Sequence, residues 1–237
     1  MAAAGTTRQE AALDLLIIIG VLVVSKALLL RVDQIWAFAG PISLLLALSF
    51  AHWRISLRSI TWSSIGLTRP KSIWFLLAYT VVALIVTIAA GEIAGMVASA
   101  WFGPPDAIAQ GIDARYRDRF REVADNPLQF ALWLAIAWII GGFTEELLFR
   151  GALFARLEAL FLGVPLAALL AGAGQAVLFG QQHLYYQGYA GWVATGVIAL
   201  ISSLLYLAFR RNLFPLILSH GISNSVGLTL LFLQTPS

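Results

Sequence analysis

The residues of this chain that are best suited to chemistry lie together in positions 145–150, where two carboxylates and a guanidinium interrupt an apolar sequence. An ionised side chain at the centre of a bilayer costs about 2.5–3.5 kcal/mol on insertion scales. Glu146 and Arg150 are four residues apart, so on a helix they share a face and can form an ion pair. Glu145 points about 100° away from Glu146 around the helix axis, which leaves it free to meet another helix. These charges therefore indicate pairing, a wet cavity or catalysis.

Two later segments each carry a histidine with a partner four residues away. Phe179 and His183 form one such pair, and His220 and Asn224 form the other. On helices the members of each pair lie on one face. Together with the segment at 145–150, three helices thus offer a polar stripe to the same interior.

A hairpin is expected to bring two of these stripes together. Residues 163–165 read Gly-Val-Pro, a sequence that favours a turn. Glu145 and His183 are each 19 residues from residue 164. If two antiparallel helices reverse direction there, we expect these two side chains to lie at the same height.

The composition identifies the solvent of these helices. The 237 residues are 60% hydrophobic and 11% charged, whereas an ordinary soluble domain carries roughly 25% charged residues. Lipid must therefore solvate most of the chain. Its basic residues are scattered and its net charge is only +3, so a nucleic-acid partner is not expected. The absence of cysteine excludes disulfides, thiolate catalysis and cysteine-based metal sites.

Seven apolar segments are long enough, or nearly long enough, to cross a membrane at about 20 residues per crossing. A closed helix satisfies its own backbone in lipid, so the sequence predicts an all-α, polytopic membrane helical bundle with about seven transmembrane helices. The segments run approximately over residues 12–30, 35–52, 73–100, 128–160, 164–183, 191–209 and 213–233.

The polar interruptions suggest an orientation. Residues 54–72 carry four basic side chains and no acid, whereas residues 103–127 are close to neutral. The positive-inside rule then favours a cytoplasmic N-terminus in a multi-pass protein, of the plasma membrane if the source is bacterial. Asn126 followed by Pro127 is typical of a helix start. Lys26, near the end of the first segment, is expected to snorkel to the interface.

The longest apolar segment, 128–160, exceeds the thickness of a bilayer and contains a glycine pair at 141–142. We expect this pair to bend or break the helix.

In this order, Glu-Glu-x-x-x-Arg at 145–150, Phe-x-x-x-His at 179–183 and His-x-x-x-Asn at 220–224 resemble the motifs of one family. It is the CAAX prenyl endopeptidase and bacteriocin-processing (CPBP) family of intramembrane proteases. The resemblance implies two parts of one integrated bundle. Residues 1–127 would form N-terminal transmembrane helices and connecting loops, and residues 128–237 a catalytic helical core.

The resemblance also implies an activity, the hydrolysis of a peptide bond in a membrane-associated protein or peptide. Such chemistry needs an activated water and donors for the tetrahedral oxyanion. Glu145 and His183 would activate the water, as the family's catalytic residues do. His220 and Asn224 would donate hydrogen bonds to the oxyanion. Supporting roles fall to three further residues, Glu146, Arg150 and Phe179.

Three alternatives stay open. Glu145, His183 and His220 are also a plausible zinc set of the His₂Glu type, so Zn²⁺ is an alternative cofactor. The resemblance favours a metal-free mechanism, and it does not firmly imply any cofactor. A proton-coupled transporter also keeps buried glutamate and histidine, but the expected paired halves are not found in the sequence. A non-catalytic membrane scaffold or immunity protein is the third alternative.

Overall fold

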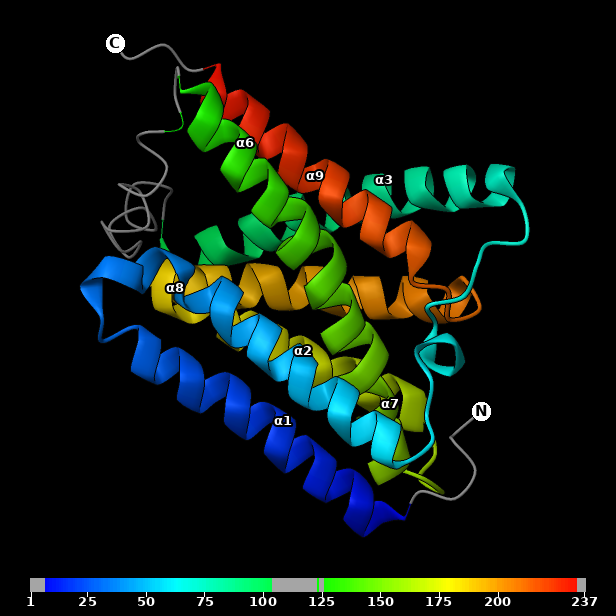
Figure 1. Ribbon diagram of the computed structural model, residues 1–237. Helices are drawn as coiled ribbons and strands as arrows, with labels where there is room; N and C mark the ends of the chain where they lie inside the picture. Colours follow the sequence, from blue (N-terminus) through cyan, green and yellow to red (C-terminus); the bar gives the residue numbers. More distant parts are fainter. Residues whose placement is uncertain (1–6, 104–122, 124–125, 234–237) are drawn as a thin grey trace.

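The computed structural model describes residues 7–103, 123 and 126–233. All regular elements in these residues are helices (Figure 1). When contiguous helices are counted as one, they form six spans that are long and apolar enough to cross a membrane. The predicted all-α membrane bundle is confirmed, and the protein is an integral, multi-pass membrane protein. Most of the near-neutral loop expected at 103–127 lies outside the described residues. The elements are α1 (Arg8–Leu29), η1 (Asp33–Phe38), α2 (Ala39–Leu57), η2 (Trp62–Ile65), α3 (Ile73–Phe102), α6 (Pro127–Ile136), η3 (Ala137–Leu153), α7 (Phe154–Leu160), α8 (Ala167–Ala208) and α9 (Phe214–Phe232).

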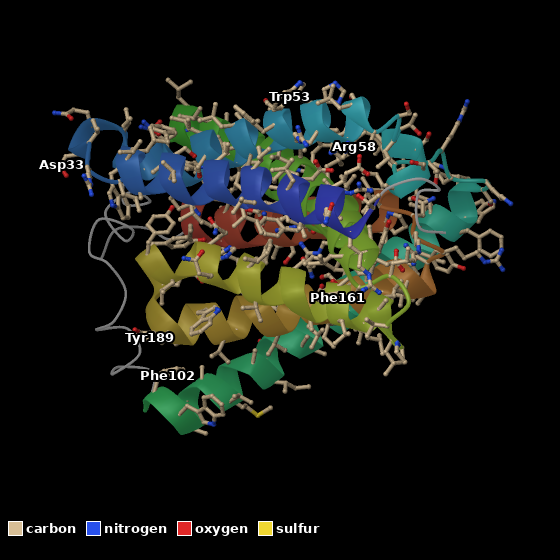
Figure 2. The ribbon with its side chains drawn as sticks, turned by 90° about the horizontal axis from the view of Figure 1, so that it is seen from below. Asp33, Trp53, Arg58, Phe102, Phe161 and Tyr189 are labelled. Carbon is tan, nitrogen blue, oxygen red and sulfur yellow. The ribbon has the colours of Figure 1, made fainter. Side chains whose placement is uncertain are left out.

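The fifth of these spans, α8, is folded back on itself. Gly188 in its middle has φ 64° and ψ −166°, a conformation that glycine adopts without a steric penalty. The amide of Gln175 on the first arm donates to the carbonyl oxygen of Ala199 on the second arm at 3.2 Å. Figure 2 shows the two arms, yellow and orange, side by side. The fold-back accounts for the two apolar segments that the sequence predicts at 164–183 and 191–209.

The helix α3 shows how the bundle meets lipid. Its inward face is built from small residues, among them Ala83 and Ala94, which are fully buried. Its outward face carries large apolar side chains, including Ile85 and Met96, which are more than half exposed. Small residues let membrane helices approach closely, while large apolar ones are solvated by the hydrocarbon. The same composition thus serves packing on one side and lipid contact on the other.

The segment from Pro127 to Leu160 is one continuous helical rod made of α6, η3 and α7. Its start is as predicted, because the side chain of Asn126 accepts a hydrogen bond from the backbone N–H of Gln129 at 3.2 Å. Of the two outcomes expected at the glycine pair 141–142, a bend or a break, the break is wrong, because the helical segment continues through it. Residues Ala137–Leu153 are wound as a π-helix instead.

Helices α7 and α8 form the hairpin expected around residue 164. The chain turns through Gly163, which has a φ of 80°. The rings of Phe149 and Phe179 are in edge contact, with 5.0 Å between their centroids. Both residues are 15 positions from residue 164. The hairpin therefore brings Phe149 and Phe179 to the same height, and the pairing predicted for Glu145 and His183 stays a prediction.

A buried ion cluster ties α1, α2 and α7 together at one end of the bundle. The carboxylate of Asp14, which is 0% exposed, lies 2.7 Å from Arg54 and 3.6 Å from both Arg58 and Arg156. Because α2 continues to Leu57, Arg54 belongs to the helix, not to the polar loop expected from 54 onward.

The turn before α9 is held from two sides. Gly66, with φ 111°, lies against this turn, and its carbonyl oxygen accepts a hydrogen bond from the N–H of Leu213 at 2.9 Å. The guanidinium of Arg211 pairs with both carboxylate oxygens of Glu158 at 2.6 Å. These hydrogen bonds raise the pKa of Arg211. The start of α9 is therefore fixed relative to α7.

Candidate active site

One cavity of about 490 Å³ lies between η3, α8 and α9, and residues of α1, α2, α3 and α6 complete its wall. Side chains from distant parts of the sequence meet there. All seven residues that the sequence singles out line it, namely Glu145, Glu146, Arg150, Phe179, His183, His220 and Asn224.

Glu146 is the centre of a buried hydrogen-bonded network. Its carboxylate, 2% exposed, lies 3.2 Å from the guanidinium of Arg150 and 2.9 Å from Nδ1 of His220. The pair with Arg150 is the one that the four-residue spacing predicts. Arg150 also stacks over the ring of Phe179, with its Cζ 4.7 Å from the ring centroid. The bond to His220 joins η3 to α9, and helical spacing alone does not predict it.

Glu145 has a more open environment than its neighbour. Its side chain is 13% exposed, and its nearest ionisable partner is His220, with 3.9 Å between Oε2 and Nε2. That distance is longer than a hydrogen bond. The carboxylate therefore lines the cavity without a direct hydrogen bond to that imidazole.

His183 is oriented by its own helix. Nδ1 lies 2.9 Å from the carbonyl oxygen of Phe179. A carbonyl oxygen can only accept, so Nδ1 carries the hydrogen and donates it. In the neutral ring Nε2 then has a free lone pair. The ring also packs against Phe179 and Tyr186, which fixes its plane.

The glycine pair at 141–142 brings α9 close to η3. A methyl group on Gly142 would lie 3.1 Å from the carbonyl oxygen of Ile217, and one on Gly141 would collide with the amide of Asn224. Glycine is therefore needed here for close approach. The π-helix places this contact beside Glu145, and π-helical segments, which are rare, occur frequently at functional sites.

Lys26 is a site residue that sequence reasoning assigned to the membrane interface. Its side chain turns inward, is 8% exposed and lines the cavity. Its ammonium donates to the main-chain oxygen of Gln182 at 3.2 Å and also to the side-chain oxygen of the same residue. The expected snorkelling is wrong, because these two acceptors are available inside. The signal was present in the sequence as an isolated charge within an apolar span.

The zinc alternative requires that the ligand atoms of Glu145, His183 and His220 lie around one point. Glu145, His183 and His220 line one cavity, but among the described residues no three His, Asp or Glu side chains gather closely enough to hold a metal ion. Zinc needs ligand atoms at about 2.0–2.2 Å from one point. The arrangement does not fit a bound zinc ion, and we derive no step through one.

Fold and cavity define the class of this protein, a polytopic membrane protein with a buried glutamate–histidine site. Residues 127–226 match the family model described as type II CAAX prenyl endopeptidase Rce1-like. The resemblance inferred from the three motifs is thereby confirmed. All seven residues predicted for the site lie within the matched region. Comparison of the chain with curated proteins and with solved structures gives no match.

Proposed function

We propose that this protein is a metal-free intramembrane endopeptidase, in which Glu145 and His183 activate a water for attack on a peptide bond. The family supports a CAAX-type protease acting on a peptide substrate at the bilayer. The observation that carries the assignment of residues is the open carboxylate of Glu145, on the same cavity wall as a histidine whose Nδ1 is engaged by Phe179.

In the first step a water molecule lies between Glu145 and His183. The Glu145 carboxylate takes a proton while the water oxygen forms a bond to the carbonyl carbon of the substrate. The lone pair on Nε2 of His183 accepts a hydrogen bond from the same water and orients it. General-base catalysis of this kind contributes typically about 10²–10⁴-fold in rate.

In the second step the oxyanion needs donors. The amide of Asn224 supplies one N–H, and Nε2 of His220 supplies another when its ring is doubly protonated. Glu146 at 2.9 Å and Glu145 at 3.9 Å provide the counter-charge for that ring. The carbon–nitrogen bond then breaks, and the proton held by Glu145 passes to the leaving amine.

The cavity wall also has an apolar part, formed by side chains such as Leu44, Ile140 and Leu216. A peptide that carries a lipid chain can bury that chain against such a surface. We therefore place the substrate among lipid-modified peptides, as the description of the family indicates.

The test uses Glu145→Ala and His183→Ala, with Glu92→Ala and His52→Ala as matched controls at exposed positions. Each variant is purified, its thermal unfolding is measured, and the membrane peptides of cells that express it are compared by mass spectrometry. Both site variants should fold and yet accumulate an uncut peptide, with cleavage in proteoliposomes reduced at least about 10²-fold. Full function in both site variants would favour the non-catalytic scaffold.

Removal of metal tests the mechanism separately. Because the site is proposed to work without zinc, EDTA should leave the cleavage rate of the purified enzyme unchanged. Metal analysis of the active protein should find zinc well below one equivalent. Loss of activity in EDTA that zinc alone restores would overturn the metal-free mechanism.

A further inference from the structure

Lys26 is a buried cation on the cavity wall, and the proposed hydrolysis gives it no role. It lies three residues before the end of α1, close enough for a lysine to reach the headgroups. Its side chain instead turns into the bundle and is 8% exposed. Burial of a cation is expensive unless a partner compensates it.

The partners that hold Lys26 are neutral. Its ammonium donates to the main-chain and side-chain oxygens of Gln182, and it lies 5.1 Å from the ring centroid of Tyr185. Gln182 is itself fixed, because its amide donates to the side-chain oxygen of Gln181 at 2.6 Å. The cation is therefore held in place beside the cavity. An ammonium has three N–H groups, so one is left for a ligand after the two bonds to Gln182.

The other charged side chains of the cavity have an ionisable partner within 4.0 Å. Arg150 pairs with Glu146 at 3.2 Å, and Glu145 faces His220 at 3.9 Å. Among the described residues, no carboxylate lies within 4.0 Å of the ammonium of Lys26, and Glu145 acts on it only from further away. The cavity thus presents a fixed positive charge at one position and the proposed water-activating carboxylate at another.

We propose that Lys26 binds the C-terminal carboxylate of the peptide substrate. This inference rests on the proposed function, since it takes the ligand to be a peptide. A terminal carboxylate is the anion that a peptide with a free C-terminus carries whatever its sequence. When Lys26 holds this carboxylate, a peptide bond near the C-terminus of the substrate lies at Glu145. Internal segments of membrane proteins have no terminal carboxylate and therefore lack this anchor. Lys26 is a specificity residue in this scheme and takes no part in the chemical step.

The test compares two quenched-fluorescence peptides that end in S-farnesyl-Cys-Val-Ile-Ala, one with a free carboxylate and one with a C-terminal amide. In proteoliposomes the wild type should cleave the acid with a kcat/KM about 10- to 100-fold above that of the amide, mainly through KM. Lys26→Met should lose this preference, and Lys26→Arg should keep part of it. Lys71→Met, which removes the exposed lysine at the start of α3, should behave as the wild type.

Binding provides a readout that does not need turnover. The Glu145→Ala protein should bind the acid more tightly than the amide, and addition of Lys26→Met should make the two affinities equal. Equal cleavage of acid and amide by the wild type would overturn the role of Lys26 and leave the proposed function intact. Cleavage of neither peptide, with equal binding of both, would overturn both proposals. If Lys26→Met does not fold, the preference of the wild type for the acid over the amide and the behaviour of Lys26→Arg test the role of Lys26.

Discussion

Glu145 and Glu146 are adjacent in the sequence, but their carboxylates have different surroundings. Glu146 is 2% exposed and bonded to two cationic or polar groups, whereas Glu145 is 13% exposed and lies 3.9 Å from its nearest partner. The first arrangement fixes η3 against α9. The second leaves an acceptor open to the cavity.

This difference predicts opposite results for two small substitutions. Glu146→Gln leaves the buried guanidinium of Arg150 without a counter-ion, and breaking a buried pair costs about 3–5 kcal/mol. Glu145→Gln removes no pair within hydrogen-bond distance and keeps the side-chain volume, so the free energy of unfolding should stay within about 1 kcal/mol of the wild type. Unfolding in detergent measures both, with Glu92→Gln on the exposed face of α3 as control. A larger loss of stability in Glu145→Gln would contradict this division of roles.

The sequence predicted those side-chain pairs that lie within one helix. A spacing of four residues was enough for Glu146 with Arg150, because helical geometry alone decides it. The bond from His220 to Glu146 spans 74 residues, and that from Lys26 to Gln182 spans 156. Such bonds depend on how helices rotate against one another, which local spacing does not determine.

At the level of elements, α8 was predicted well and η3 was not. The two apolar segments separated near residue 188 indicated two arms, because lipid requires each arm to be apolar along its length. The π-helix left no periodic signal that distinguishes it from an α-helix over 17 residues. It is associated with the close approach of α9 at the glycine pair, which is a tertiary contact.

The fold-back of α8 predicts a strong effect of a single methyl group at Gly180. A Cβ there would lie 2.5 Å from the carbonyl oxygen of Trp192 and 2.6 Å from its ring. The two arms would have to separate, which should lower stability by about 1–3 kcal/mol and displace His183. Thermal unfolding and cleavage rate both report this change in Gly180→Ala. Gly95→Ala on α3, where nothing lies within 4 Å, should change neither; equal behaviour of the two variants would refute the packing.

At the scale of the molecule, basic side chains gather at the end that holds the N-terminus of α1. Arg8 donates to the carbonyl oxygen of Leu162 in the turn after α7, and Asp14 of the same helix pairs with Arg54. Figure 1 shows this end of α1 close to α7. By the positive-inside rule, this distribution agrees with the orientation suggested by the sequence. We therefore propose that this end of the bundle lies in the cytoplasm.

The lack of cysteine makes this orientation easy to test. Val32→Cys and Ser63→Cys place single thiols at exposed positions in the segments before and after α2 and leave every charge in place. A membrane-impermeant maleimide should label Val32→Cys in intact cells and Ser63→Cys only after permeabilisation. The reverse pattern of labelling would show that the protein has the opposite orientation in the membrane.

The two buried charges of α1, Asp14 and Lys26, also have a consequence for biogenesis. Arg54 follows Asp14 by 40 residues, whereas Gln182 follows Lys26 by 156. The ribosome therefore delivers a partner for Asp14 early and a partner for Lys26 only when most of the protein has been made. Until then the ammonium of Lys26 lacks both acceptors that hold it inside the bundle, and from the last turn of α1 it can reach the headgroups instead. The inward position of Lys26 is therefore established only after the first arm of α8 has been made.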